Sequence, residues 1–104
     1  MTNQEKNQAL FMQLVVMFHS LTMTQLGKTK NPVSDKIERN LSAAQGTIDM
    51  LEMLKDKTKG NLDSTEERFL MELLKEVKLN YVDEAAKPDP APAQPPTEEG
   101  KPSA

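Results

Sequence analysis

The densest group of side chains that could do chemistry in this sequence is a run of lysines before a glycine. Lys55, Lys57 and Lys59 precede Gly60, and Asn61 follows it. Ammonium groups beside a glycine turn could hold an anionic ligand, and a following helix N-terminus would add backbone N–H donors. The same lysines would also complement the negative end of a preceding helix, where glycine is a common stop. Two interpretations therefore stay open: a helix end, and an anion site at Lys57, Lys59, Gly60 and Asn61.

Few other side chains in the sequence could serve in catalysis or bind a metal. His19 is the single histidine, and its neighbours three and four residues away are Val15, Val16, Thr22 and Met23. None of these side chains can ligate a metal or orient an imidazole as a carboxylate would. Cysteine is absent, which excludes a thiol nucleophile and cysteine-ligated zinc. We therefore predict no catalytic residue, no metal site and no cofactor, and a protein that is not an enzyme.

Size and charge narrow the class of protein further. The 104 residues carry 13 basic and 16 acidic side chains, a net charge of −3, which is the wrong balance for a general nucleic-acid binder. The longest apolar stretch covers residues 9–18 and contains Gln13, so it is far shorter than the roughly 20 residues that a membrane helix needs. No positively charged segment precedes it, as a signal peptide would require. We expect a single cytoplasmic domain with neither a nucleic-acid nor a membrane partner.

The sequence contains three helical patterns, at about residues 3–26, 35–58 and 64–83, and these predicted helices would position the lysine-rich run and His19. The apolar stripe expected to face the core in the first helix is Leu10, Leu14, Met17 and Leu21; in the second it is Ile37, Leu41, Ala44, Ile48 and Leu51; in the third it is Leu70, Leu73, Leu74, Val77 and Tyr81. These sets recur every three or four residues, as on one face of a helix. No strand pattern competes with them. The sequence predicts an all-α, three-helix antiparallel bundle.

The ends of the helices carry recognisable signals. Gly27 is predicted to stop the first helix as a left-handed C-cap, and Gly60, after basic residues, is predicted to stop the second. Ser34 is predicted to cap the second helix. Asp63 or Ser64, each with a glutamate three positions on, is predicted to open the third with a capping box.

The last twenty residues differ in composition from the rest. Residues 85–104 hold six of the seven prolines and no Val, Ile, Leu, Met or aromatic side chain. Such a segment cannot bury enough apolar surface to offset its ordering entropy. We therefore divide the chain into a helical domain, 1–84, and a disordered Pro-rich tail, 85–104. The tail either aids solubility or presents its short P-x-x-P motif to a partner protein.

The first two helices carry more apolar surface than one stripe each. The additional apolar or small positions are Met12, Val16 and Met23 in the first helix and Ala43, Gly46, Met50 and Leu54 in the second. These positions form either a broader core or a contact surface. If one extra face is covered within the monomer, the other would meet a second copy. We therefore treat these seven residues as a candidate interface of a homo-oligomer, most simply a dimer. A close helix crossing there would offset the cost of about 1 kcal/mol that a glycine such as Gly46 imposes inside a helix.

Several of these segments together resemble a bacterial family known only as domain of unknown function 1844. The resemblance rests on residues 47–51, on the run Lys-Thr-Lys-Gly-Asn-Leu at 57–62 and on the apolar positions and Asn-Pro pair of the first third of the chain. It covers about residues 11–82, and the 57–62 run is its most specific part. It implies a bacterial cytosolic helical protein, and it brings no catalytic residues with it.

The sequence thus favours a small interaction or accessory protein that associates with itself. The alternative is a regulatory module that holds an anionic small molecule near the Lys57–Asn61 turn. A ligand of that kind should raise the melting temperature, and an interaction protein should instead show concentration-dependent mass.

Overall fold

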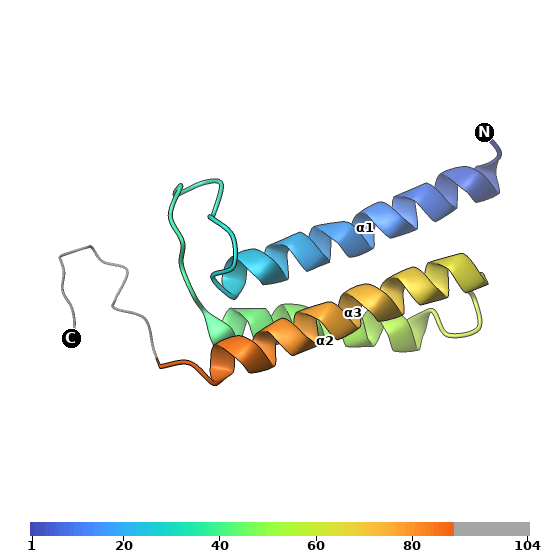
Figure 1. Ribbon diagram of the computed structural model, residues 1–104. Coiled ribbons are helices and arrows are strands. Elements are labelled where there is room, and N and C mark those ends of the chain that lie inside the picture. Colours follow the sequence, from blue (N-terminus) through green and yellow to red (C-terminus); the bar gives the residue numbers. More distant parts are fainter. Residues whose placement is uncertain (89–104) are drawn as a thin grey trace.

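The computed structural model describes residues 1–88 and contains three helices, α1 (Asn3–Gln25), α2 (Leu41–Lys57) and α3 (Ser64–Ala85). Each helix packs against the other two (Figure 1), which confirms the predicted all-α, three-helix architecture. α1 and α3 run in the same direction and α2 runs opposite to both. Two contacts fix this arrangement, because Gln8 bonds to Asp63 near the start of both helices and Lys28 to Asp83 near their ends. The tail residues from 89 on lie outside the described part of the chain.

Side-chain caps set where the helices begin. Asp63 accepts from the backbone N–H of Glu66 at 2.8 Å, and the Glu66 carboxylate accepts from that of Asp63 at 2.9 Å. This is the reciprocal capping box predicted for α3, and Thr2 and Glu5 form another at the start of α1. Each cap satisfies backbone donors that the first helical turn leaves without partners.

The predicted start of the second helix was wrong by six residues. α2 begins at Leu41, with Asn40 as its cap, and not at residue 35 after Ser34. The reason is a compact turn that Asn31 organises: its side-chain oxygen accepts from the backbone N–H of Val33 at 2.8 Å, and its own N–H donates to the Lys36 carbonyl. Asp35 sits in the turn with a φ of 59°, a left-handed conformation that no helix can include.

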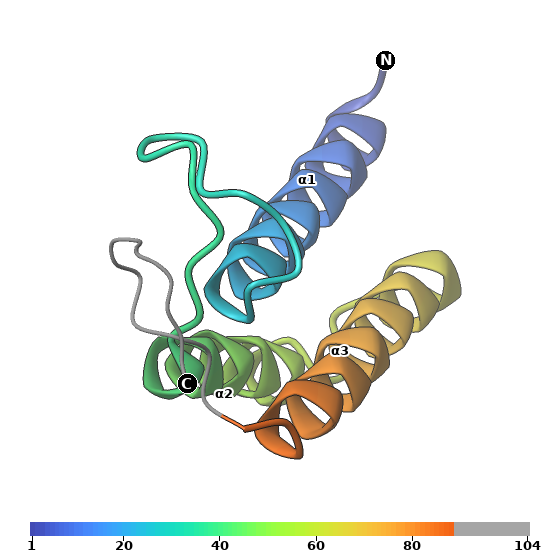
Figure 2. The same cartoon turned by 60° about the vertical axis from the view of Figure 1, so that its left-hand side comes forward.

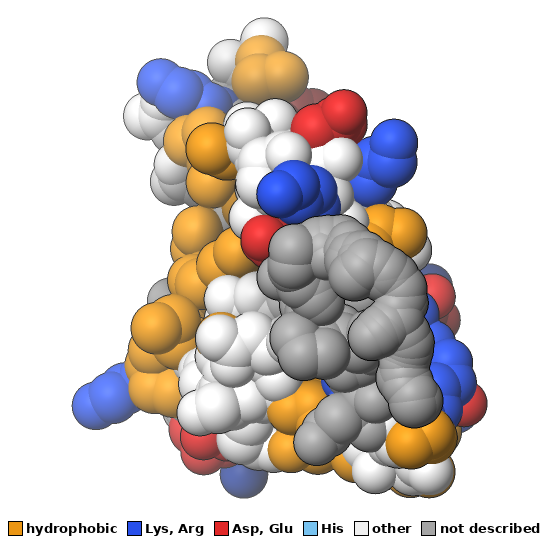
Figure 3. Space-filling model, turned by 90° about the vertical axis from the view of Figure 1, so that its left-hand side faces the viewer, with side chains coloured by type: hydrophobic (Ala, Val, Ile, Leu, Met, Phe, Trp, Pro, Cys, Tyr) orange, Lys and Arg blue, Asp and Glu red, His pale blue; other side chains and the backbone are white. Residues whose placement is uncertain are grey.

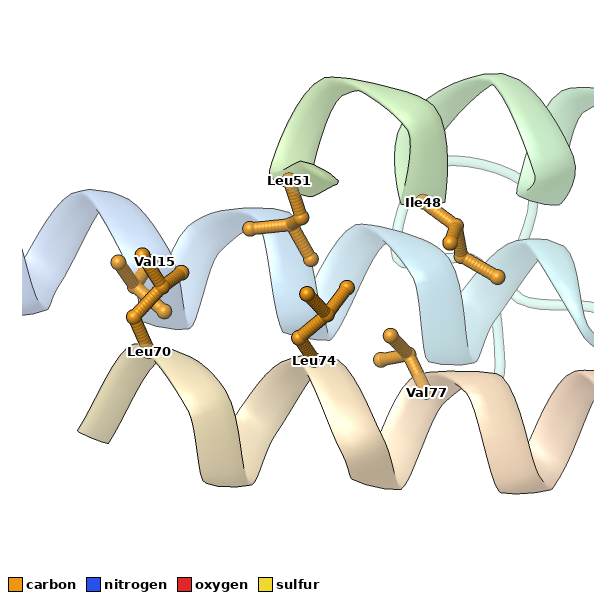
Figure 4. Packing of buried hydrophobic residues seen from close by; sticks show 6 residues of the cluster. All are labelled: Val15, Ile48, Leu51, Leu70, Leu74 and Val77. Carbon is orange, nitrogen blue, oxygen red and sulfur yellow. The ribbon is translucent and has the colours of Figure 1, made fainter. Parts of the chain in front are cut away.

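The core lies along the line where the three helices meet. Figure 4 shows its side chains pointing toward one another: Val15 of α1, Ile48 and Leu51 of α2, and Leu70, Leu74 and Val77 of α3. Phe11, Phe18, Met23, Leu54, Leu62, Phe69, Leu73 and Tyr81 pack around this cluster. The predicted apolar stripe of α3 is therefore confirmed, as are Ala44, Ile48 and Leu51 in α2.

The predicted core stripe of α1 was wrong. Leu10, Leu14, Met17 and Leu21 are all exposed, and the buried residues of this helix are Val15 and Thr22. At 100° per residue the two sets lie roughly 120° apart around α1. Thr22 can face the core because its hydroxyl donates to the Phe18 carbonyl at 2.8 Å. Apolar side chains occur around most of α1, so their spacing did not reveal which face turns inward.

The two predicted stop glycines, Gly27 and Gly60, provide a matched stability test. Their φ angles are 80° and 82°, so the left-handed conformation predicted for Gly27 is confirmed and Gly60 adopts it as well. We expect alanine at either position to lower the free energy of unfolding by about 1 kcal/mol or more. Gly27→Ala should cost more, because its new Cβ would lie 3.3 Å from Cβ of Arg39, whereas nothing lies within 4 Å at Gly60. Urea unfolding of both variants measures the difference, and equal losses would contradict it.

Candidate functional site

The most unusual surface feature is an apolar stripe along α1 that no part of the described chain covers. It consists of Leu10, Leu14, Met17 and Leu21, each of which is between 39% and 60% exposed. Successive members are four, three and four residues apart, so all four share one face of the helix. Single exposed apolar residues are ordinary on protein surfaces, whereas contiguous rows of large ones are uncommon on monomeric proteins.

The same helix is also depleted of charge. Residues 7–27 contain no Asp, Glu, Lys or Arg, although charged residues make up 28% of the whole sequence. A solvent-facing helix normally presents charged side chains opposite its apolar face, and a helix without them is typical of an element buried on several sides. None of the helices in residues 1–88 is long and apolar enough to cross a membrane.

α2 continues the apolar surface next to α1. The Thr47 hydroxyl donates to Oε1 of Gln25 at 2.7 Å, which marks the line where α1 and α2 meet. On the side of this line that faces away from the core, α1 presents its apolar stripe and α2 presents Ala43, Gly46 and Met50. Met50 is half exposed, and a Cβ built at Gly46 would have no neighbour within 4 Å. We call this combined area the α1–α2 surface: Leu10, Leu14, Met17, Leu21, Ala43, Gly46 and Met50.

A space-filling view supports this description. Figure 3 shows hydrophobic side chains gathered in a column along the left edge of the face that it presents. In Figure 2, the segment between α1 and α2 lies on the side of α1 away from α3, so it stands at one end of the α1–α2 surface. Val33 and Ile37 of this segment are also exposed.

The seven residues predicted as an interface divide into groups. Ala43, Gly46 and Met50 belong to the α1–α2 surface, and Val16 is exposed on a different side of α1. Met23 and Leu54 pack against the core of their own chain, and Met12 is half-buried. The close crossing expected at Gly46 does not occur between the described helices, since the position is exposed and open.

The lysine-rich turn lies at the end of α2 remote from the Asn31 turn. Lys57, Lys59, Gly60 and Asn61 are all exposed there. The nearby depression is lined by Lys55 and Lys59 but also by the carboxylates Asp56 and Glu67, which would repel an anion. Asp63 and Glu66 already bind each other's backbone N–H groups at the start of α3. These contacts leave fewer donors for a ligand than the sequence pattern indicated.

His19 has a partner that its neighbours in the sequence could not reveal. Its Nε2 forms a hydrogen bond with Oε1 of Glu76 on α3, 57 residues away in the chain. Glu76 is exposed, so the pair joins two helices at the surface. Among the described residues, no group of three or more His, Asp or Glu side chains is placed to hold a metal ion.

A charge network that no local sequence pattern predicted joins the ends of α1 and α3. Lys28 Nζ lies 2.7 Å from Oδ2 of Asp83 and 2.7 Å from Oε2 of Glu84. Arg39 donates to the Glu84 backbone carbonyl at 2.8 Å, and Lys87 Nζ lies 2.9 Å from Oε2 of Glu84. Hydrogen bonds donated by Lys28 and then by Lys87 lower the pKa of Glu84 to about 2. The pKa of Lys28 is raised because its ammonium group donates to the carboxylates of Asp83 and Glu84. The network fastens the segment between α1 and α2 to the end of α3.

Glu84 should therefore give the protein an acid-sensitive contribution to stability. A carboxylate whose pKa is lower in the folded chain stabilises it above the unfolded pKa, near 4.5, and loses that effect as the pH falls toward 2. We expect Glu84→Gln to lower the free energy of unfolding at pH 7 and to have a much smaller effect at pH 2. Denaturant unfolding at both pH values measures this, with Glu72→Gln on the exposed face of α3 as the control. A loss that is the same at both pH values would contradict the assignment.

Comparison with known proteins adds one match. Neither a curated protein nor a solved structure matches the chain. The matching family model spans residues 8–83, which include the core residues of all three helices, the α1–α2 surface and the lysine-rich turn. The chain therefore belongs to the family described as Domain of unknown function (DUF1844), as its resemblance in sequence indicated.

Proposed function

We propose that this protein is a non-enzymatic interaction or accessory protein of the cytoplasm that associates with itself through the α1–α2 surface. The observation that carries the proposal is the row of exposed leucine and methionine residues on the part of α1, from residue 7 on, that contains no Asp, Glu, Lys or Arg. Covering the exposed half of a leucine or methionine contributes about 1 kcal/mol. A domain of this size also buries a smaller share of its unfolded surface than a larger domain does, so a second copy would add to its stability.

The occupant we propose for the surface is a second copy of this chain. The remaining residues, 89–104, contain no Val, Ile, Leu, Met or aromatic side chain, so they lack the groups that would fill an apolar stripe. A strongly charged partner would find no opposite charge on residues 7–27. A second copy, in contrast, brings the same uncharged row of large apolar side chains.

Binding of an anionic small molecule remains the other candidate from the sequence, and we do not propose it. The carboxylates of Asp56 and Glu67 lie in the same depression as Lys55 and Lys59. Lys55 also lies 3.2 Å from Oε1 of Glu52, so its charge is partly compensated. The seven residues of the α1–α2 surface, in contrast, include no charged side chain that would oppose an apolar contact.

The melting temperature tests self-association because an associated state gains stability with protein concentration. We expect the midpoint of thermal unfolding of the full chain to rise steadily as the protein concentration is increased from low to high micromolar. Inorganic phosphate, the probe for an anion site, should leave the midpoint unchanged at constant ionic strength. A midpoint that is independent of protein concentration would contradict the proposal, and a rise with phosphate that Lys57→Ala with Lys59→Ala removes would favour the anion site.

A further inference from the structure

We infer that two copies pack with their α1 helices antiparallel about a twofold axis that passes near the level of residues 15 and 16. This inference rests on the proposed self-association and specifies its geometry. It follows from the order of the four stripe residues, from the position of the Asn31 turn and from the direction of the helix dipoles.

The spacing of the stripe is the same when read in either direction. Leu10, Leu14, Met17 and Leu21 are separated by four, three and four residues. When a second α1 runs antiparallel, Leu10 meets the partner's Leu21 and Leu14 meets the partner's Met17, so every layer is filled from both sides. Alternating steps of three and four residues are also those that let side chains of two helices interlock at a shallow crossing angle.

The segment between α1 and α2 favours the antiparallel choice over the parallel one. It stands beside the C-terminal end of α1 on the side away from α3 (Figure 2), which is the side of the α1–α2 surface. In a parallel pair, the two copies of this segment would meet at the same end and compete for one space. In an antiparallel pair they lie at opposite ends, where Val33 and Ile37 can approach the N-terminal half of the partner's α1.

The helix dipoles also favour the antiparallel arrangement. Aligned helix dipoles repel each other when helices lie side by side in parallel and attract when they are antiparallel. Charged side chains usually dominate such pairings, but residues 7–27 have none, so the dipoles and the packing decide.

Cysteine crosslinking distinguishes the two geometries cleanly, because the natural sequence contains no cysteine. Leu10 and the partner's Leu21 share a layer in the antiparallel pair, whereas two copies of Leu10 are displaced by roughly 16 Å along the helix axis. A disulfide needs Cα atoms within about 7 Å. We therefore expect neither Leu10→Cys nor Leu21→Cys to form a covalent dimer alone on mild oxidation, and a mixture of the two to form one.

Two further arms make the result decisive. Leu14→Cys mixed with Met17→Cys should also crosslink because these positions share the inner layer, whereas only the outer pair separates the two geometries, since two copies of Leu14 are displaced by only about 4.5 Å along the axis. Val16→Cys, which lies off the stripe, should not crosslink with any of them. The molar mass of the wild-type chain is measured alongside. A dimeric wild type whose Leu10→Cys variant crosslinks alone, or whose mixtures do not crosslink, overturns the antiparallel geometry and leaves self-association standing. A monomeric wild type overturns both.

Discussion

Glutamate in place of Leu14 is expected to convert the associated protein into a folded monomer. The substitution puts a carboxylate in the centre of the α1–α2 surface, where a second copy offers no positive charge within residues 7–27. Burying such a charge without a partner costs several kcal/mol, and each 1.4 kcal/mol weakens association tenfold. We expect the dissociation constant to rise at least a hundredfold, as measured by sedimentation velocity.

Val16→Glu is the matched control for this experiment. Val16 is 43% exposed and Leu14 is 39% exposed, so both substitutions add the same charge to the same helix at similar exposure. Val16 lies on a different side of α1, outside the stripe, and its variant should keep the wild-type mass. Helical circular dichroism of both variants verifies that each remains folded. Equal effects of the two substitutions would show that the stripe is not the interface.

Leu51→Ala is expected to produce the largest loss of stability within one chain. Leu51 is fully buried in the core cluster, between residues of α1 and α3. Removing a buried leucine side chain to the β-carbon costs about 2–5 kcal/mol, because the cavity that remains closes only in part. For a domain of this size, such a loss would lower the melting temperature by roughly 10 °C or more.

Met53→Ala serves as the control on the same helix. Met53 is about half exposed, and its truncation should cost well under 1 kcal/mol. Both variants are best compared in the Leu14→Glu background, where unfolding is not coupled to association. A small effect of Leu51→Ala in that background would contradict the arrangement of the core.

Local signals in the sequence identified most of the fold. The Asp63–Glu66 capping box and the stops at Gly27 and Gly60 are determined by neighbouring residues, so a single sequence contains them. The apolar stripe of α3 was also clear, because charged residues occupy its other faces. The start of α2 was predicted too early because Asn31 forms hydrogen bonds with the backbone of Val33 and Lys36, and these bonds hold the segment in a turn.

Two parts of the surface could not be predicted from local pattern. α1 has apolar residues on nearly every side, so the spacing of Leu10 and Leu14 fitted a core stripe as well as a surface stripe. The partners of Glu84 were equally hidden, because Lys28 and Arg39 are 56 and 45 residues away in the chain. Contacts between distant segments depend on how each helix is rotated about its own axis in the bundle. No short sequence motif predicts that rotation.

The molar mass of the full chain in solution tests the central claim most directly. One chain has a mass of 11.6 kDa, so light scattering during size-exclusion chromatography separates one copy from two without ambiguity. We predict a mass near twice that value at high micromolar concentration, falling toward a single chain on dilution and for Leu14→Glu at every concentration. A wild-type mass of one chain throughout this range would contradict self-association through the α1–α2 surface.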